Sequence, residues 1–170
     1  MTPEQFNQVY PILFQWISSV LDNFKAQARP VSAAGFQRLP QYYQRDVLDG
    51  AQFVIVPRLP MPPLSQMGLH EYSAFENGDF AGITYLNTFF VKQGHQTESL
   101  FFHELVHVIQ WSLLGPEKFL AAYAAGLEQF SYAASPLEAM AYGAQHRFDL
   151  GKEVFDVVPL VKDKLAQMGL

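Results

Sequence analysis

Residues 98 to 114 read Glu-Ser-Leu-Phe-Phe-His-Glu-Leu-Val-His-Val-Ile-Gln-Trp-Ser-Leu-Leu and are followed by Gly115-Pro116. Their apolar residues predict a helix that Thr97 caps and the Gly-Pro pair ends. Within this helix, His103, Glu104 and His107 form the pattern H-E-x-x-H. Residues four positions apart share one helical face, so both imidazoles can meet one metal ion while Glu104 reaches a water beside it. The pattern therefore predicts a metal site in the middle of a helix.

The rest of the chain predicts an α+β fold in which a small β-sheet separates a first helix from a helical half. Short apolar runs indicate strands, and helical spacing of apolar residues indicates helices. Strands are expected over about 52 to 56 and 82 to 92, and further helices over about 3 to 28 (with Pro11 as a place for a kink), 41 to 49, 117 to 131, 135 to 149 and 153 to 168. No internal repeat or linker divides the sequence, which predicts one domain over residues 1–170.

The segment from 82 to 92 has the highest content of β-branched and aromatic residues, which predicts one continuous strand ahead of the metal helix. Alternation would place Ile83 and Tyr85 on one face and Thr84 and Leu86 on the other.

Composition limits the chemistry of the chain. None of the 170 residues is cysteine, so there is no disulfide, thiol nucleophile or thiolate ligand, and a metal would need His, Asp or Glu. The net charge is −5, and there is no run of Lys or Arg. This argues against nucleic acid and against an anionic membrane surface as partners, because both require concentrated positive charge.

The apolar run from Val9 to Leu21 resembles the core of a signal peptide, but Glu4 stands where a positive region would be needed. The run is also too short and too polar to span a bilayer. We therefore expect no cleaved signal peptide and a cytoplasmic location, with leaderless secretion as the other route.

Two histidines leave a catalytic zinc site incomplete, because such sites usually have three protein ligands. Gln110 and Leu113 stand where the longer H-E-x-x-H-x-x-G-x-x-H pattern has Gly and His, so a third histidine at that spacing is excluded. Glu117 follows the helix end too closely to fold back. Glu128 and Glu138 both remain candidates, and Glu138 has a competing role in Ser135-Pro136-Leu137-Glu138, which reads as a helix capping box.

The two segments His103-Glu104-Leu105-Val106-His107 and Glu138-Ala139-Met140-Ala141-Tyr142 resemble the minimal bacterial zincin-like metallopeptidases of the gluzincin type. The resemblance covers about residues 80 to 148. It implies a zincin-like fold, a Zn²⁺ ion bound by His103, His107 and Glu138, and a peptide or protein substrate paired with the strand before the metal helix. Tyr142 departs from the many family members that have Asp at this position, so a charged partner for a metal-bound histidine is lost.

On this reading, the function is zinc-dependent hydrolysis of peptide bonds, with Glu104 as the general base. Tyr142 and His146 follow Glu138 at four and eight positions, so either could donate a hydrogen bond to the developing oxyanion. Tyr142 as a core residue and His146 as a surface residue are the simpler interpretations. The alternatives for the whole chain are a non-catalytic zinc-binding interaction module on the same scaffold, and a metal-free helical domain with a chance motif.

Overall fold

The computed structural model describes all residues from 1 to 170 and has the expected α+β composition. Its six helices are α1 (Pro3–Phe24), α2 (Arg45–Gly50), α3 (Ser73–Glu76), α4 (Glu98–Gln129), α5 (Pro136–Leu150) and α6 (Val157–Gln167). Its four strands are β1 (Arg29–Pro30), β2 (Gln52–Val56), β3 (Gly82–Tyr85) and β4 (Thr88–Lys92). None of the helices is both long and apolar enough to cross a membrane.

The four strands form one mixed sheet in the order β1-β2-β4-β3. β2 and β4 are parallel, whereas β1 and β3 run antiparallel to their neighbours. The two central strands are the most apolar, and Phe89, Phe90 and Val91 of β4 are fully buried. β3 is therefore an edge strand, and it lies against α4.

The prediction of one strand over 82 to 92 is wrong, because the chain turns back at Leu86-Asn87 and forms the β3–β4 hairpin. Leu86 has a φ of 56°, a left-handed conformation that is uncommon for a residue with a branched side chain. The turn contains none of the glycines that usually mark a two-residue hairpin, which explains why the apolar run reads as continuous. The predicted alternation of faces therefore does not continue across the turn.

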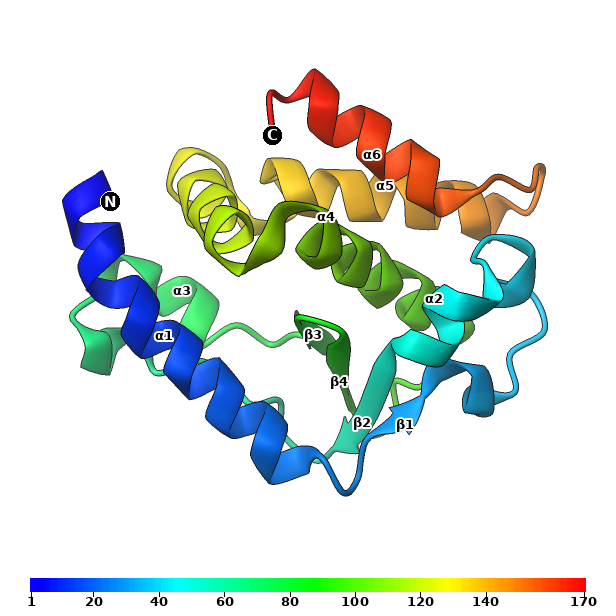
Figure 1. Cartoon of the computed structure of the whole chain (residues 1–170), viewed down its shortest axis with the longest axis horizontal. Helices are drawn as coiled ribbons and strands as arrows, with labels where there is room; N and C mark the ends of the chain where they lie inside the picture. Colours follow the sequence, from blue (N-terminus) through cyan, green and yellow to red (C-terminus); the bar gives the residue numbers. More distant parts are fainter.

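Helix α4 runs through the centre of the molecule, with the sheet on one side and α5 and α6 on the other (Figure 1). Gly115 breaks it with a φ of 73° and a ψ of 166°, and Pro116 begins its second half. A left-handed φ favours glycine, and proline fits the first position of a new helix, so the predicted stop between two helices is confirmed as a kink. The kink changes the direction of the second half of α4.

The remaining differences from the sequence are mostly at element ends. α1 ends at Phe24 rather than near residue 28, and it passes through Pro11 as one helix. α2 begins at Arg45 instead of 41, and α6 begins at Val157 because the Asp156 side chain caps its first turn. The two-residue strand β1 has no pattern in the sequence and was not predicted.

Candidate metal centre

Two buried histidines of α4 face the same point. His103 is 4% exposed and His107 is 5% exposed, and their Nε2 atoms lie 3.1 Å apart. They occupy successive turns of one helical face, as the i, i+4 spacing predicts. Because neighbouring side chains bury this face between β3 and α5, the two rings are largely shielded from bulk water.

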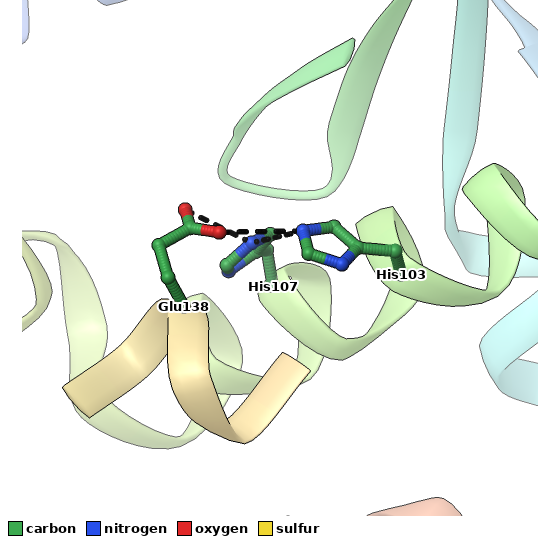
Figure 2. Close-up of side chains that lie close together, drawn as sticks. All are labelled: His103, His107 and Glu138. Atoms are coloured by element: carbon green, nitrogen blue, oxygen red, sulfur yellow. Dashed lines mark hydrogen bonds and ion pairs between the residues drawn. The ribbon is translucent and has the colours of Figure 1, made fainter. Parts of the chain in front are cut away.

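Glu138 approaches the same point from α5. Its Oε2 atom lies 3.4 Å from Nε2 of His103, and its Oε1 atom lies 3.3 Å from Nε2 of His107. Figure 2 shows the carboxylate and both imidazoles pointing toward one another from two helices. Glu138 is 1% exposed, so it is as buried as the histidines.

The structure also decides between the other roles proposed for these glutamates. The capping-box interpretation of Glu138 is wrong: no side chain caps the start of α5, and the Ser135 hydroxyl instead donates to the Tyr132 carbonyl at 2.8 Å. Glu128 is not brought to the histidines, because its carboxylate accepts from the Tyr72 hydroxyl at 2.6 Å and pairs with the amino group of Met1. Glu117, which was predicted to lie too close to the helix end to fold back, is exposed and does not belong to the group.

Two glutamines fix the orientation of the imidazoles. Nδ1 of His103 lies 3.0 Å from Oε1 of Gln145, and Nδ1 of His107 lies 2.8 Å from Oε1 of Gln110. The Gln110 amide donates to the Leu137 carbonyl at 3.0 Å, and the Gln145 amide donates to the Ser99 hydroxyl at 2.9 Å, so both amide oxygens face the histidines. An amide oxygen only accepts, so each Nδ1 carries a proton and Nε2 is the nitrogen that faces the other two ligands.

Sequence reasoning did not assign these two glutamines, although their positions carried a signal. Gln110 follows His107 by three residues and Gln145 follows Glu138 by seven, which places each on the inner face of its helix. The partner of Nδ1 of His103 is therefore the neutral amide of Gln145 and not the Tyr142 hydroxyl.

The three side chains fit the requirements of a metal ion. Their ligand atoms lie within 4.8 Å of one another, and His103, His107 and Glu138 are all buried. Two ligands about 2.05 Å from a tetrahedral Zn²⁺ ion are separated by about 3.3 Å, which is close to the observed distances. Oε2 of Glu138 is buried and has no hydrogen-bond donor. Since buried carboxylate oxygens are normally satisfied, this atom supports the fit of a cation at the site.

The charges of the group depend strongly on one another. Burial lowers the pKa of His107, but the nearby Glu138 carboxylate raises it more, and the pKa reaches about 9. Burial raises the pKa of Glu138, but His107 and His103 together bring it well below its usual range. The protein without metal therefore holds a proton between His107 and Glu138, and a cation would replace this proton.

The carboxyl group of Glu104 is held by the β3–β4 hairpin. It is 3% exposed, and Oε2 accepts from the Thr84 hydroxyl at 2.6 Å. Gly82 gives it room, because a Cβ atom at this position would lie 2.4 Å from Oε1 of Glu104. Burial raises the pKa of Glu104, although His103 and His107 partly oppose this shift. A carboxyl group with a raised pKa is well suited to accept a proton near neutral pH.

Three tyrosines surround Glu138. The Tyr123 hydroxyl donates to Oε1 of Glu138 at 2.6 Å, and the Tyr142 ring lies 4.6 Å from the His103 ring, centroid to centroid. Burial raises the pKa of Tyr132, and the charge of Glu138 raises it further. Tyr123 and Tyr132 were not predicted, because neither lies at a regular spacing from the motif. Tyr142 is 42% exposed, so it is not an ordinary core residue.

His146 does not join this group. Its side chain is exposed and forms no hydrogen bond or ion pair, which agrees with the simpler interpretation of a surface histidine at the end of α5. Its proposed catalytic role stays a prediction without support from the geometry.

The free edge of β3 lies beside the site. Ile83 and Tyr85 pair with β4 across the hairpin, and the Thr84 carbonyl points the other way, where it accepts from Nε1 of Trp111 at 3.1 Å. The backbone groups of Gly82 point to the same outer edge as those of Thr84, because alternate residues of an antiparallel pair face away from the partner strand. An extended chain could pair here only over a short length, since Trp111 already occupies the Thr84 carbonyl.

Comparison with models of known protein families, with curated proteins and with solved structures gives no match to this chain.

Proposed function

We propose that the protein is a zinc-dependent hydrolase of peptide bonds, with a metal ion bound by His103, His107 and Glu138 and with Glu104 as the general base. The observation that carries this proposal is the convergence of three buried ligand side chains on one point, with one oxygen of Glu138 lacking a hydrogen bond. Two histidines and one carboxylate are the ligand set of catalytic rather than structural zinc, and the absence of cysteine agrees with this assignment.

A bound Zn²⁺ ion would polarise the substrate carbonyl and lower the pKa of the attacking water. The surrounding residues prepare the site for this chemistry. Gln110 and Gln145 keep the proton of each histidine on Nδ1, and Tyr123 holds one oxygen of Glu138. The ligands therefore have little freedom before a metal binds, which reduces the cost of ordering them.

Glu104 would take a proton from the water and pass it to the leaving nitrogen. Its Oε2 atom is held by the Thr84 hydroxyl, so Oε1 is the oxygen left to carry the proton. The Gly82 backbone lies directly beside Oε1, on the outer edge of β3 where an extended substrate would pair. This arrangement would place the base next to the substrate backbone rather than next to a side chain.

The order of elements supports a zincin-like identity for the fold. An edge strand, the helix with H-E-x-x-H and a later helix with the third ligand occur in the sequence order of the resembled family. The Tyr142 hydroxyl is the better candidate for oxyanion stabilisation, because its ring contacts His103 whereas His146 lies in solvent.

The test compares the wild-type protein with Glu104→Gln and His103→Ala. We expect one equivalent of zinc in the wild type and in Glu104→Gln by elemental analysis, and loss of zinc in His103→Ala. Hydrolysis of unfolded casein and of a mixed peptide library should disappear in both variants. Glu117→Gln is the matched control, because it makes the same change on an exposed part of α4.

Undiminished turnover in Glu104→Gln would refute the assignment of the base. Bound zinc with no hydrolysis of any peptide by the wild type would favour the non-catalytic module instead. A protein that binds no divalent metal would refute the whole proposal.

A further inference from the structure

An apolar cavity adjoins the metal centre. It has a volume of about 100 Å³ and is lined by 26 residues, of which 20 are hydrophobic. Glu104, His107 and Glu138 are among the lining residues. The other walls come from one face of α1, from the second half of α4, and from the segment around α3. The kink at Gly115 directs the second half of α4 along this cavity, so the break in the helix shapes it.

The cavity separates two parts of the apolar interior. A cluster of 33 buried residues lies around the sheet and α4, whereas Leu64, Leu69 and Tyr72 form a small cluster of their own. Phe6, Val9, Tyr10 and Leu13 of α1 face the cavity and are only half-buried. Val9 and Leu13 pack against the buried clusters, and the rings of Phe6 and Tyr10 stack on one another, but part of each of the four side chains still faces the cavity. Apolar side chains that point inward normally pack to the density of a crystal, so the cavity leaves part of this apolar surface unfilled.

Three of the tyrosine hydroxyls in the cavity wall are already used by the protein. The Tyr72 hydroxyl donates to Glu128, the Tyr85 hydroxyl donates to the Pro60 carbonyl, and the Tyr123 hydroxyl donates to Glu138. The wall contains no Lys, Arg or Asp. Beyond the metal centre the cavity therefore offers mainly ring faces and aliphatic side chains, which favour an uncharged apolar ligand.

We propose that this cavity binds a compact apolar group of the substrate that is attached next to the hydrolysed bond. The proposal deepens the proposed function and rests on it for the link to hydrolysis. Because Glu104, His107 and Glu138 line the cavity, a group held there lies beside whatever reaches the metal, as a group attached to the substrate next to the hydrolysed bond would. An apolar cavity of about 150 Å³ holds benzene, so about 100 Å³ accommodates a group of about four to six carbon atoms.

Such a group could be an apolar amino-acid side chain or the hydrocarbon chain of an acyl group. The two sources share the same chemistry, and a set of hydroxamic acids distinguishes them. Straight-chain members from two to eight carbons represent the acyl source, and leucine and phenylalanine hydroxamates represent the side-chain source. Binding to the zinc-loaded protein is followed by the fluorescence of Trp111, which lines the cavity, in a Trp16→Phe background.

We expect the affinity of straight-chain hydroxamates to increase about fourfold per added methylene up to about six carbons and then to level off. Tighter binding of the leucine or phenylalanine compound than of the hexanoyl compound would assign the side-chain source, and the reverse order would assign the acyl source. An affinity that does not change with chain length, together with no gain for the amino-acid compounds, would overturn the proposal.

Variants separate filling of the cavity from effects on the metal. Ala124→Phe places a ring in the cavity and should remove the gain with chain length, while acetohydroxamate binds within about twofold of wild type. Ala125→Phe is the matched control, because the neighbouring alanine is exposed. If Ala124→Phe does not fold, Leu120→Ala enlarges the same wall and should move the levelling-off point to longer chains. If the affinity of Leu120→Ala levels off at the same chain length as in the wild type, the proposal is contradicted.

A last measurement distinguishes failure of this proposal from failure of the proposed function. Hexanol is titrated into the metal-free protein, and the Trp111 emission is recorded. We expect saturable binding that Ala124→Phe or Leu120→Ala alters and Ala125→Phe does not. Binding of hexanol by a protein that takes up no zinc would retain the cavity and refute the hydrolase, whereas no binding of hexanol would overturn the cavity as a ligand site.

Discussion

Replacement of Gly82 by alanine tests how the hairpin holds the general base. The added Cβ atom would lie 2.4 Å from Oε1, 2.9 Å from Cδ and 3.2 Å from Cγ of Glu104. Real Cβ contacts essentially never fall below 3.0 Å, so either the carboxyl group or the strand must move. Gly82 is not among the glycines with positive φ, so alanine fits the backbone itself. The whole cost should therefore come from Glu104.

The size of the effect follows from two opposing contributions. Overpacking a buried site costs about 1–3 kcal/mol. Replacing glycine by alanine at a compatible backbone position stabilises a protein by about 0.4–1 kcal/mol. We therefore expect Gly82→Ala to destabilise the wild type by about 1–2 kcal/mol, and to be neutral or stabilising in a Glu104→Ala background. The difference between the two backgrounds should be about 1–3 kcal/mol, which is the range for residues in direct contact.

The assay is urea unfolding of the metal-free proteins, analysed for the free energy of unfolding in all four members of the cycle. Gly143→Ala on α5 is the control, because nothing lies within 4 Å of the added Cβ atom, and it should be neutral or stabilising in both backgrounds. Equal destabilisation by Gly82→Ala with and without Glu104 would refute the reasoning, because the cost would then arise from the strand and not from the carboxyl group.

Three further predictions concern the ligands and their partners. Gln110→Leu should weaken zinc binding about 10- to 100-fold, because Nδ1 of His107 loses its acceptor. Chelator competition against the wild type measures the change, and an unchanged zinc affinity would exclude an orienting role for Gln110. Because the pKa of His107 is raised to about 9, the zinc affinity should rise by about tenfold per pH unit from pH 7 toward 9. The metal-free protein should lose stability over the same interval, as its His107–Glu138 pair loses its proton. Chelator competition and urea unfolding at pH 7, 8 and 9 measure the two trends, and a zinc affinity that does not change with pH would contradict the prediction. Tyr142→Phe should retain zinc but lower turnover by about 10²- to 10³-fold if the Tyr142 hydroxyl stabilises the oxyanion. If turnover falls in His146→Gln and not in Tyr142→Phe, His146 and not Tyr142 is the residue that stabilises the oxyanion.

The helices and the metal site could be predicted because their signals are local. The spacing of His103 and His107 depends only on helix geometry, and the Gly115-Pro116 break follows from backbone conformations that these two residues favour. The position of Glu138 depends on how α5 returns to α4, which is a tertiary property. Sequence spacing could therefore reduce the third ligand to Glu128 or Glu138 but could not choose between them.

The β3–β4 hairpin and the residues that contact the metal ligands and Glu104 could not be predicted either, because they too depend on tertiary structure. Leu86 adopts a left-handed conformation only because strands β3 and β4 pair on both sides of it. Gly82 looks like the start of an ordinary strand until the carboxyl group of Glu104 is placed against it. The cavity depends on α1 and the second half of α4, which lie about 100 residues apart in the sequence, and no local pattern connects them.

The surroundings of Glu104 link its protonation to the metal. In the metal-free protein, burial raises the pKa of Glu104, and the negative charge of Glu138 adds to this effect. The two histidines partly oppose this shift. A divalent cation bound by His103, His107 and Glu138 in place of the proton on His107 would add positive charge near Glu104 and so lower the pKa of its carboxyl group. A bound cation would therefore favour the ionised form of Glu104, which is the form that acts as a base. The same burial that would make an isolated carboxyl group inert therefore makes this one responsive to the metal, which explains why the hairpin encloses Glu104 instead of leaving it in solvent.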